Sequence, residues 1–156
     1  MRILIIGGTR FLGRYLVESA LEHNHEVTLF NRGKSNPGLF PQLETIIGDR
    51  EKDENKLEGR VWDAVIDVAG YVPRIVRLSA ELLKENVSRY IFISSISAYD
   101  DAVFKKIGVD ESDPVAKIKD ETVEEVTGET YGALKALCEK AVQDIYGERA
   151  LSVRPG

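Results

Sequence analysis

A tyrosine and a lysine stand four residues apart at Tyr131 and Lys135. Side chains at this spacing share one face of a helix, so the lysine ammonium would lie near the phenol. A nearby positive charge favours the ionised phenol and lowers its pKa from about 10. Tyr131 would then act as a general acid or base near neutral pH. Because the same spacing arises by chance in many helices, the pair needs support from the rest of the chain.

A glycine-rich turn near the start of the chain supplies that support. The turn reads Gly7-Gly8-Thr9-Arg10-Phe11-Leu12-Gly13 and follows the apolar run 2–6. Glycines allow a sharp turn and a close approach of the backbone to phosphate, and the N–H groups at a helix start attract an anion. The turn therefore predicts a dinucleotide site. A nucleotide-triphosphatase loop is excluded, because Arg14 and Tyr15 occupy the places of its lysine and its hydroxyl residue.

Alternating strands and helices must position these groups. Six short apolar runs predict strands at 2–6, 26–30, 44–47, 63–68, 90–94 and 150–153, and their nearly continuous apolar character is typical of a parallel sheet buried on both faces. Helical spacing relates Leu12, Leu16 and Ala20; Ile75, Leu78 and Leu82; and the apolar residues from Leu134 to Ile145, before Gly147. We expect one α/β domain over residues 1–156: a Rossmann-like, doubly wound parallel sheet of about six strands in three layers (α/β/α). Its ligand crevice should lie at the carboxyl ends of the strands.

Taken together, the glycine turn and the Tyr131–Lys135 pair resemble those of extended short-chain dehydrogenase/reductases, in the epimerase/dehydratase branch. Arg10 replaces the usual middle glycine, as in an atypical subgroup that includes the chloroplast stem-loop-binding proteins. The segment 93–99, Ile-Ser-Ser-Ile-Ser-Ala-Tyr, is similar to the serine-rich segment of the family, and the position of Tyr99 selects Ser95 as its catalytic serine.

The resemblance implies a role for each matching residue. Catalysis would fall to Tyr131, Lys135 and Ser95, with Ser95 holding the substrate oxygen. The cofactor would contact the residues of the glycine turn, the ends of the second to fifth strands and the catalytic helix, namely Gly7, Gly8, Thr9, Arg10, Phe11, Leu12, Gly13, Asn31, Arg32, Asp49, Val68, Ala69, Gly70, Ser94, Tyr131 and Lys135.

The end of the second strand bears on the choice of cofactor. An NAD site usually places a carboxylate there, but Asn31 and Arg32 follow Phe30. Arg32 and Arg10, with Lys34 as a looser third charge, would clamp a 2′-phosphate. The sequence favours NADP over NAD, although Asn31 would also suit an unphosphorylated ribose.

Composition narrows the partners and the location. The net charge is −5, and residues 100–129 hold ten carboxylates against four lysines, Lys106 among them. This balance disfavours nucleic acid as a partner and predicts a solvated acidic surface segment.

No apolar run is long enough for a membrane span or a secretory signal, and the single Cys138 forms no internal disulfide, which favours the cytoplasm. His23 and His25 have no further ligand at metal spacing, so we expect no metal site.

The sequence thus predicts an NAD(P)-dependent oxidoreductase, epimerase/dehydratase-like, that acts on a hydroxylated small molecule such as a nucleotide sugar. A reductase that consumes NADPH and a non-catalytic nucleotide- or RNA-binding relative remain alternatives. The resemblance implies that the substrate-binding lobe would follow Arg154-Pro155-Gly156 and is missing from these 156 residues. The oligomeric state stays open, a homodimer included.

Overall fold

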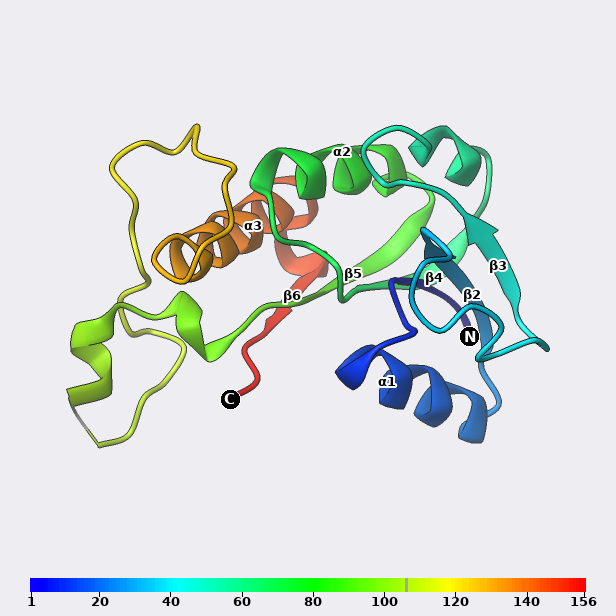
Figure 1. The fold of residues 1–156 in the computed structure, drawn as a ribbon, viewed down its shortest axis with the longest axis horizontal. Coiled ribbons are helices and arrows are strands. Elements are labelled where there is room, and N and C mark those ends of the chain that lie inside the picture. Colours follow the sequence, from blue (N-terminus) through cyan, green and yellow to red (C-terminus); the bar gives the residue numbers. More distant parts are fainter. Residues whose placement is uncertain (106) are drawn as a thin grey trace.

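The computed structural model describes residues 1–105 and 107–156 (Figure 1). Lys106 of the acidic segment lies outside them. Six strands form one parallel sheet, namely β1 (Arg2–Ile6), β2 (Glu26–Asn31), β3 (Glu44–Ile47), β4 (Trp62–Asp67), β5 (Val87–Ile93) and β6 (Ala150–Val153). The predicted strands are confirmed, and most of their bounds agree within one residue. The exception is β5, which begins three residues before the predicted Tyr90.

The strand order, β3-β2-β1-β4-β5-β6, determines where a ligand can bind. The chain moves outward from β1 to β3, then returns to the other side of β1 and continues to β6. Between β1 and β4 the connections therefore leave in opposite directions, which opens a crevice at the carboxyl ends of these strands. This order and the helices on both faces of the sheet confirm the predicted Rossmann-like α/β fold.

Three α-helices cover the sheet in the part of the chain that the structure describes (Figure 1). Helix α1 (Phe11–Glu22) packs on one face, while α2 (Pro73–Leu83) and α3 (Tyr131–Tyr146) lie together on the other. Four short 3₁₀ helices complete the chain: η1 (Glu54–Leu57), η2 (Ile96–Ala98), η3 (Asp101–Lys105) and η4 (Gly147–Arg149). No described helix is long and apolar enough to cross a membrane.

The buried faces of α1 and α2 differ from the predicted ones. In α1 the buried residues are Gly13, Val17 and Ala20, whereas Leu12 and Leu16 are only partly covered. In α2 the buried residues are Val76, Ser79, Ala80 and Leu83, and Leu78 is 39% exposed. Leucine spacing alone misplaced both faces, because the sheet accepts small side chains beneath a closely packed helix.

One half of the sheet has no helix over it on the side of α1. The register aligns Ile5, Ile66, Ile91 and Leu151 across β1, β4, β5 and β6, so these four side chains share that face. The apolar cluster around α1 includes Ile5 and the partly buried Ile66, but not Ile91 or Leu151. Leu151 remains 46% exposed, although strands of a parallel sheet are normally covered on both faces.

A buried ion pair joins the loop after β3 to the end of β4. Arg50 donates through Nη1 and Nη2 to the two carboxylate oxygens of Asp67, at 3.0 and 2.9 Å. The Asp67 side chain is fully buried and also accepts from the hydroxyl of Tyr90 at 2.8 Å. Arg50 bonds Ser79 of α2 as well, at 2.8 Å. The pair thus ties β4, β5, α2 and the loop after β3 into one polar cluster.

We predict that this pair is essential to stability. Asp67→Asn leaves the buried Arg50 guanidinium without a counter-charge, which should lower the free energy of unfolding by about 3–5 kcal/mol. Urea unfolding of the variant measures the loss. The matched control is Glu44→Gln, which breaks the exposed pair of Glu44 with Arg60 and should cost less than about 1 kcal/mol. Equal losses in the two variants would contradict the account.

Candidate active and cofactor-binding site

The glycine turn brings the backbone close to its neighbours. Gly7 and Gly8 adopt φ angles of +106° and +89°, which side chains disfavour. A Cβ on Gly7 would lie 2.6 Å from a methyl of Val68, and one on Gly13 would lie 3.0 Å from the Cα of Gly8. The turn is held to β2 by a hydrogen bond from Gly7 N to Phe30 O, at 2.9 Å. Only glycine fits this packing.

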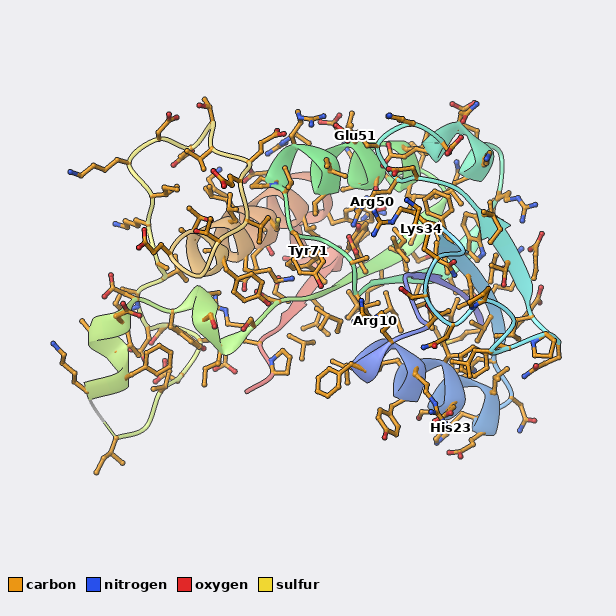
Figure 2. The ribbon with its side chains drawn as sticks, viewed as in Figure 1. Arg10, His23, Lys34, Arg50, Glu51 and Tyr71 are labelled. Carbon is orange, nitrogen blue, oxygen red and sulfur yellow. The ribbon has the colours of Figure 1, made fainter. Side chains whose placement is uncertain are left out.

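A pocket of about 1010 Å³ opens where the turn meets the carboxyl ends of the strands. It extends from the glycine turn and the residues after β2, past the ends of β3 and β4, to η2 and the start of α3. Arg10, Lys34, Arg50 and Tyr71 contribute to its lining, and Figure 2 shows them around the middle of the molecule, with His23 away from them at the far end of α1. The pocket therefore lies at the predicted crevice between β1 and β4.

Three cations line the end of the pocket near β2, namely Arg10, Arg32 and Lys34. Asn31 organises the loop that carries two of them. Its amide donates to Gly7 O at 3.4 Å and accepts from Gly33 N at 2.8 Å, while Asn36 donates to Thr9 O at 2.8 Å. The Asn31 amide is thus engaged at both ends, and the glycine turn and this loop are linked by side chains.

Lys135 is buried at the other end of the pocket and is only 3% exposed. Its ammonium donates to Gly70 O at 2.9 Å and to Ile93 O at 2.7 Å, and it lies 4.2 Å from the ring centroid of Phe92. Burial lowers the pKa of Lys135, and the negative charge of Asp67 opposes that shift. Two of the three N–H bonds of the ammonium thus point at backbone carbonyls, one just past the end of β4 and one at the end of β5.

Two serines at the end of β5 differ in environment. Ser94 is buried, and its Oγ has no hydrogen-bond partner among the described residues. Ser95 accepts a hydrogen bond from Ser97 N at 3.1 Å and so caps η2. Both serines line the pocket. A Cβ on Gly132 would lie 2.1 Å from Ser97 O, so glycine at this position lets the serine segment pack closely against the start of α3.

A second ion pair lies beside the serine segment and joins the residue after β6 to α3. Arg154, just after β6, bonds the carboxylate of Glu139 in α3 through Nε at 2.9 Å and Nη2 at 2.6 Å. Its guanidinium lies 4.3 Å from the ring centroid of Tyr99. Glu139 follows Lys135 by four residues, so one face of α3 contacts the pocket, the serine segment and the end of β6.

The structure brings nearly all the residues expected at the site into one pocket. Of those expected around the cofactor, Gly70 alone does not line it. A Cβ on Gly70 would lie 2.5 Å from the Phe92 ring, so this residue packs behind the pocket wall instead. The catalytic candidates Ser95, Tyr131 and Lys135 all line the same pocket.

Arg50 and Tyr71 line the pocket but were missed by the sequence analysis. Each directly follows a matched residue, Asp49 and Gly70, and this adjacency was the available signal. Cys138 and Trp62 are buried in the apolar core. Burial raises the pKa of the Cys138 thiol to about 12. The described residues contain no cluster of three potential metal ligands.

Comparison with known proteins gives the family. The profile of the NAD(P)H-binding family matches residues 7–130. The chain is 33% identical over 114 residues to the chloroplast stem-loop binding protein of 41 kDa b from Arabidopsis thaliana, covering 63% of this chain and 30% of that protein. It is 27% identical over 173 residues to a UDP-glucose 4-epimerase of Neisseria meningitidis serogroup B, covering 92% of this chain and 48% of that enzyme.

A solved structure shares the fold. A UDP-galactose 4-epimerase crystal structure superposes with a TM-score of 0.77 at 24% identity, covering 99% of this chain and 55% of that one. The chain thus spans about half the length of the epimerases that it matches, and less of the chloroplast protein. With the family profile covering most of its length, the chain belongs to the NAD(P)H-binding family.

Proposed function

We propose that this chain binds NADP and forms the cofactor half of an enzyme that oxidises or reduces a hydroxylated small molecule, with a nucleotide sugar as the substrate. The observation that carries the proposal is a single pocket that is lined by the glycine turn at one end and by Ser95, Tyr131 and Lys135 at the other. A dinucleotide fits such a pocket, because its phosphates would meet the glycine turn while its reactive ring would reach the catalytic residues.

The residues of the pocket suit such a cofactor. The pyrophosphate would rest on the turn between Gly7 and Gly13, where α1 begins and its first N–H groups favour an anion. Arg10, Arg32 and Lys34 would bind a 2′-phosphate, because two guanidinium forks and an ammonium stand at that end without a competing carboxylate from β2. The unpaired hydroxyl of Ser94 offers a hydrogen bond near the catalytic end.

When bound, the nicotinamide supplies hydride transfer, and the chain supplies the proton chemistry. We assign the proton transfer to Tyr131, whose phenol would give a proton to the substrate oxygen or take one from it. Ser95 would orient that oxygen, and its hydroxyl can do so because it accepts only one hydrogen bond, from Ser97 N. Lys135 would direct its third N–H toward the cofactor ribose.

The choice of a nucleotide sugar rests on the relatives. The UDP-glucose 4-epimerase and the UDP-galactose 4-epimerase both act on sugar nucleotides by name. A reductase on the same scaffold is the alternative within this reaction class, and net consumption of NADPH would distinguish it from an epimerase.

A second candidate comes from a different class. The 33% identical Arabidopsis thaliana protein is named for stem-loop binding, which favours an RNA-associated role. The net charge of −5 and the retained Ser95, Tyr131 and Lys135 support the enzyme instead. Salt-dependent binding of a stem-loop RNA, with no effect of Tyr131→Phe on any reaction, would favour this second candidate.

The catalytic assignment predicts distinct effects for two variants of the complete protein. Tyr131→Phe should abolish turnover and leave NADPH affinity within about twofold, since only the proton carrier is lost. Lys135→Met should reduce both, because it also removes a ribose contact. Steady-state kinetics and fluorescence titration with NADPH measure the two effects. If Tyr131→Phe keeps the rate within about tenfold, or about 1.4 kcal/mol of barrier, the assignment of Tyr131 is wrong.

The cation cluster predicts a preference for NADPH over NADH. Loss of a charge-assisted contact typically costs about 1.5–3 kcal/mol, so Arg32→Ala should weaken NADPH binding by about tenfold or more and change NADH binding little. Arg60→Ala, an exposed arginine outside the pocket, is the matched control and should change neither. Tighter binding of NADH by the unaltered chain, or an Arg32→Ala variant with full NADPH affinity, would refute the preference.

The uncovered face of β5 and β6 suggests what the complete protein adds. We propose that a further segment covers Leu151 and Val153, which are 46% and 39% exposed, and completes the substrate site. Residues 1–156 should therefore bind NADPH as tightly as the complete protein, within about threefold, but turn over a nucleotide sugar at least about a hundredfold more slowly. Comparable turnover by residues 1–156 and by the complete protein would disprove the proposal that a further segment completes the substrate site.

A further inference from the structure

Tyr71 lies in the pocket but belongs to none of the motifs that identify the family. It follows Gly70 in the connection between β4 and α2 and lines the pocket wall. Its side chain is 48% exposed, which is high for a large ring beside a catalytic centre. In Figure 2 the residue lies near the middle of the molecule, between the start of α2 and Arg10.

The backbone holds Tyr71 from both sides. On one side, the carbonyl of Gly70 accepts a hydrogen bond from the Lys135 ammonium at 2.9 Å. On the other, Val72 is extended, with φ −116° and ψ 122°, because Pro73 begins α2 and restricts the residue before it. The backbone on both sides of Tyr71 is therefore restrained, which keeps this residue near Lys135.

The ring of Tyr71 stands beside the catalytic pair. Its centroid lies 6.4 Å from that of Tyr131, with the two rings tilted by 39°, and 5.5 Å from the Lys135 ammonium. Tyr71 thus forms an apolar wall next to Lys135 and next to Tyr131, to which we assign proton transfer. Nearly half of its surface remains open, so this wall can accept a ligand.

The chemistry of this wall restricts the ligand. An apolar ring next to hydroxyl and ammonium groups suits a molecule with an apolar face and a hydroxylated edge. A pyranose has this form, because its axial C–H bonds make one face apolar while its hydroxyls project around the rim. A sugar whose reacting hydroxyl meets Tyr131 and Ser95 would then place its C–H face against Tyr71.

We propose that Tyr71 is a substrate-binding residue that packs against the C–H face of a pyranose and determines the preference of this site for sugars. The inference rests on the proposed function and deepens it. Tyr71 would contribute to substrate binding and leave the cofactor and the proton transfer to other residues.

The test uses the complete protein, with NADP⁺ as the hydride acceptor for turnover of UDP-glucose and NADPH as the probe of cofactor binding. Tyr71→Leu should raise the KM for UDP-glucose by about five- to tenfold, the scale of one lost ring contact, with kcat reduced less than threefold. The Kd for NADPH should stay within about twofold. Tyr71→Phe retains the ring and should recover most of the lost affinity. Tyr15→Leu is the matched control, because Tyr15 is 64% exposed on α1 and does not line the pocket.

The outcomes separate this inference from the proposed function. If the unaltered protein turns over UDP-glucose but Tyr71→Leu keeps its KM, the role of Tyr71 is wrong and the proposed function stands. If Tyr71→Leu weakens NADPH binding as much as it raises KM, the ring contacts the cofactor and the inference fails. If the unaltered protein binds NADPH but neither binds nor turns over UDP-glucose, both the sugar substrate and the role of Tyr71 are overturned.

Discussion

The site depends on one buried ammonium. Lys135 donates to Gly70 O, just past the end of β4, and to Ile93 O, the last residue of β5, so a charge from α3 joins the carboxyl ends of two central strands. A buried ammonium must satisfy its donors, and carbonyls at strand ends can accept because the sheet ladder stops there. This interaction fixes where α3 begins relative to the pocket. The placement of Tyr131 and Tyr71 follows from it.

The negative charge of the buried Asp67, the last residue of β4, partly balances this ammonium. Asp67 lies three residues before Gly70 and raises the pKa of Lys135, against the lowering effect of burial. The same carboxylate accepts from Arg50 and from Ala69 N, so it shapes the turn whose carbonyl Lys135 contacts. The loop after β3 is thereby coupled to the catalytic end through largely buried side chains. Such a network is rigid, because each member satisfies another.

The sequence predicted most of the fold and the site because its signals are local. Apolar runs located the strands, and the glycine turn located the phosphate end of the pocket. What failed needed information from the sheet. The buried face of α2 consists of Val76, Ser79, Ala80 and Leu83, which the packing of α2 against its neighbours determines, and Leu78 is 39% exposed. Gly70 packs against Phe92 behind the pocket wall, and its contact with the cofactor stays a prediction.

Other features lay beyond sequence reasoning because they join distant positions. Arg50 and Asp67 are 17 residues apart, and their pairing requires the loop after β3 to reach the end of β4, although β2 and β1 separate these strands in the sheet. The homodimer and the cytoplasmic location remain predictions.

A crystal structure of this chain with NADPH tests the central claim most directly, namely that one dinucleotide spans the crevice between β1 and β4. We expect the pyrophosphate against Gly7, Gly8 and Gly13, the 2′-phosphate between Arg10 and Arg32, and the nicotinamide ribose within hydrogen-bond distance of Lys135. A cofactor bound elsewhere, or one that enters this pocket with its nicotinamide directed away from Lys135 and Tyr131, would contradict the account.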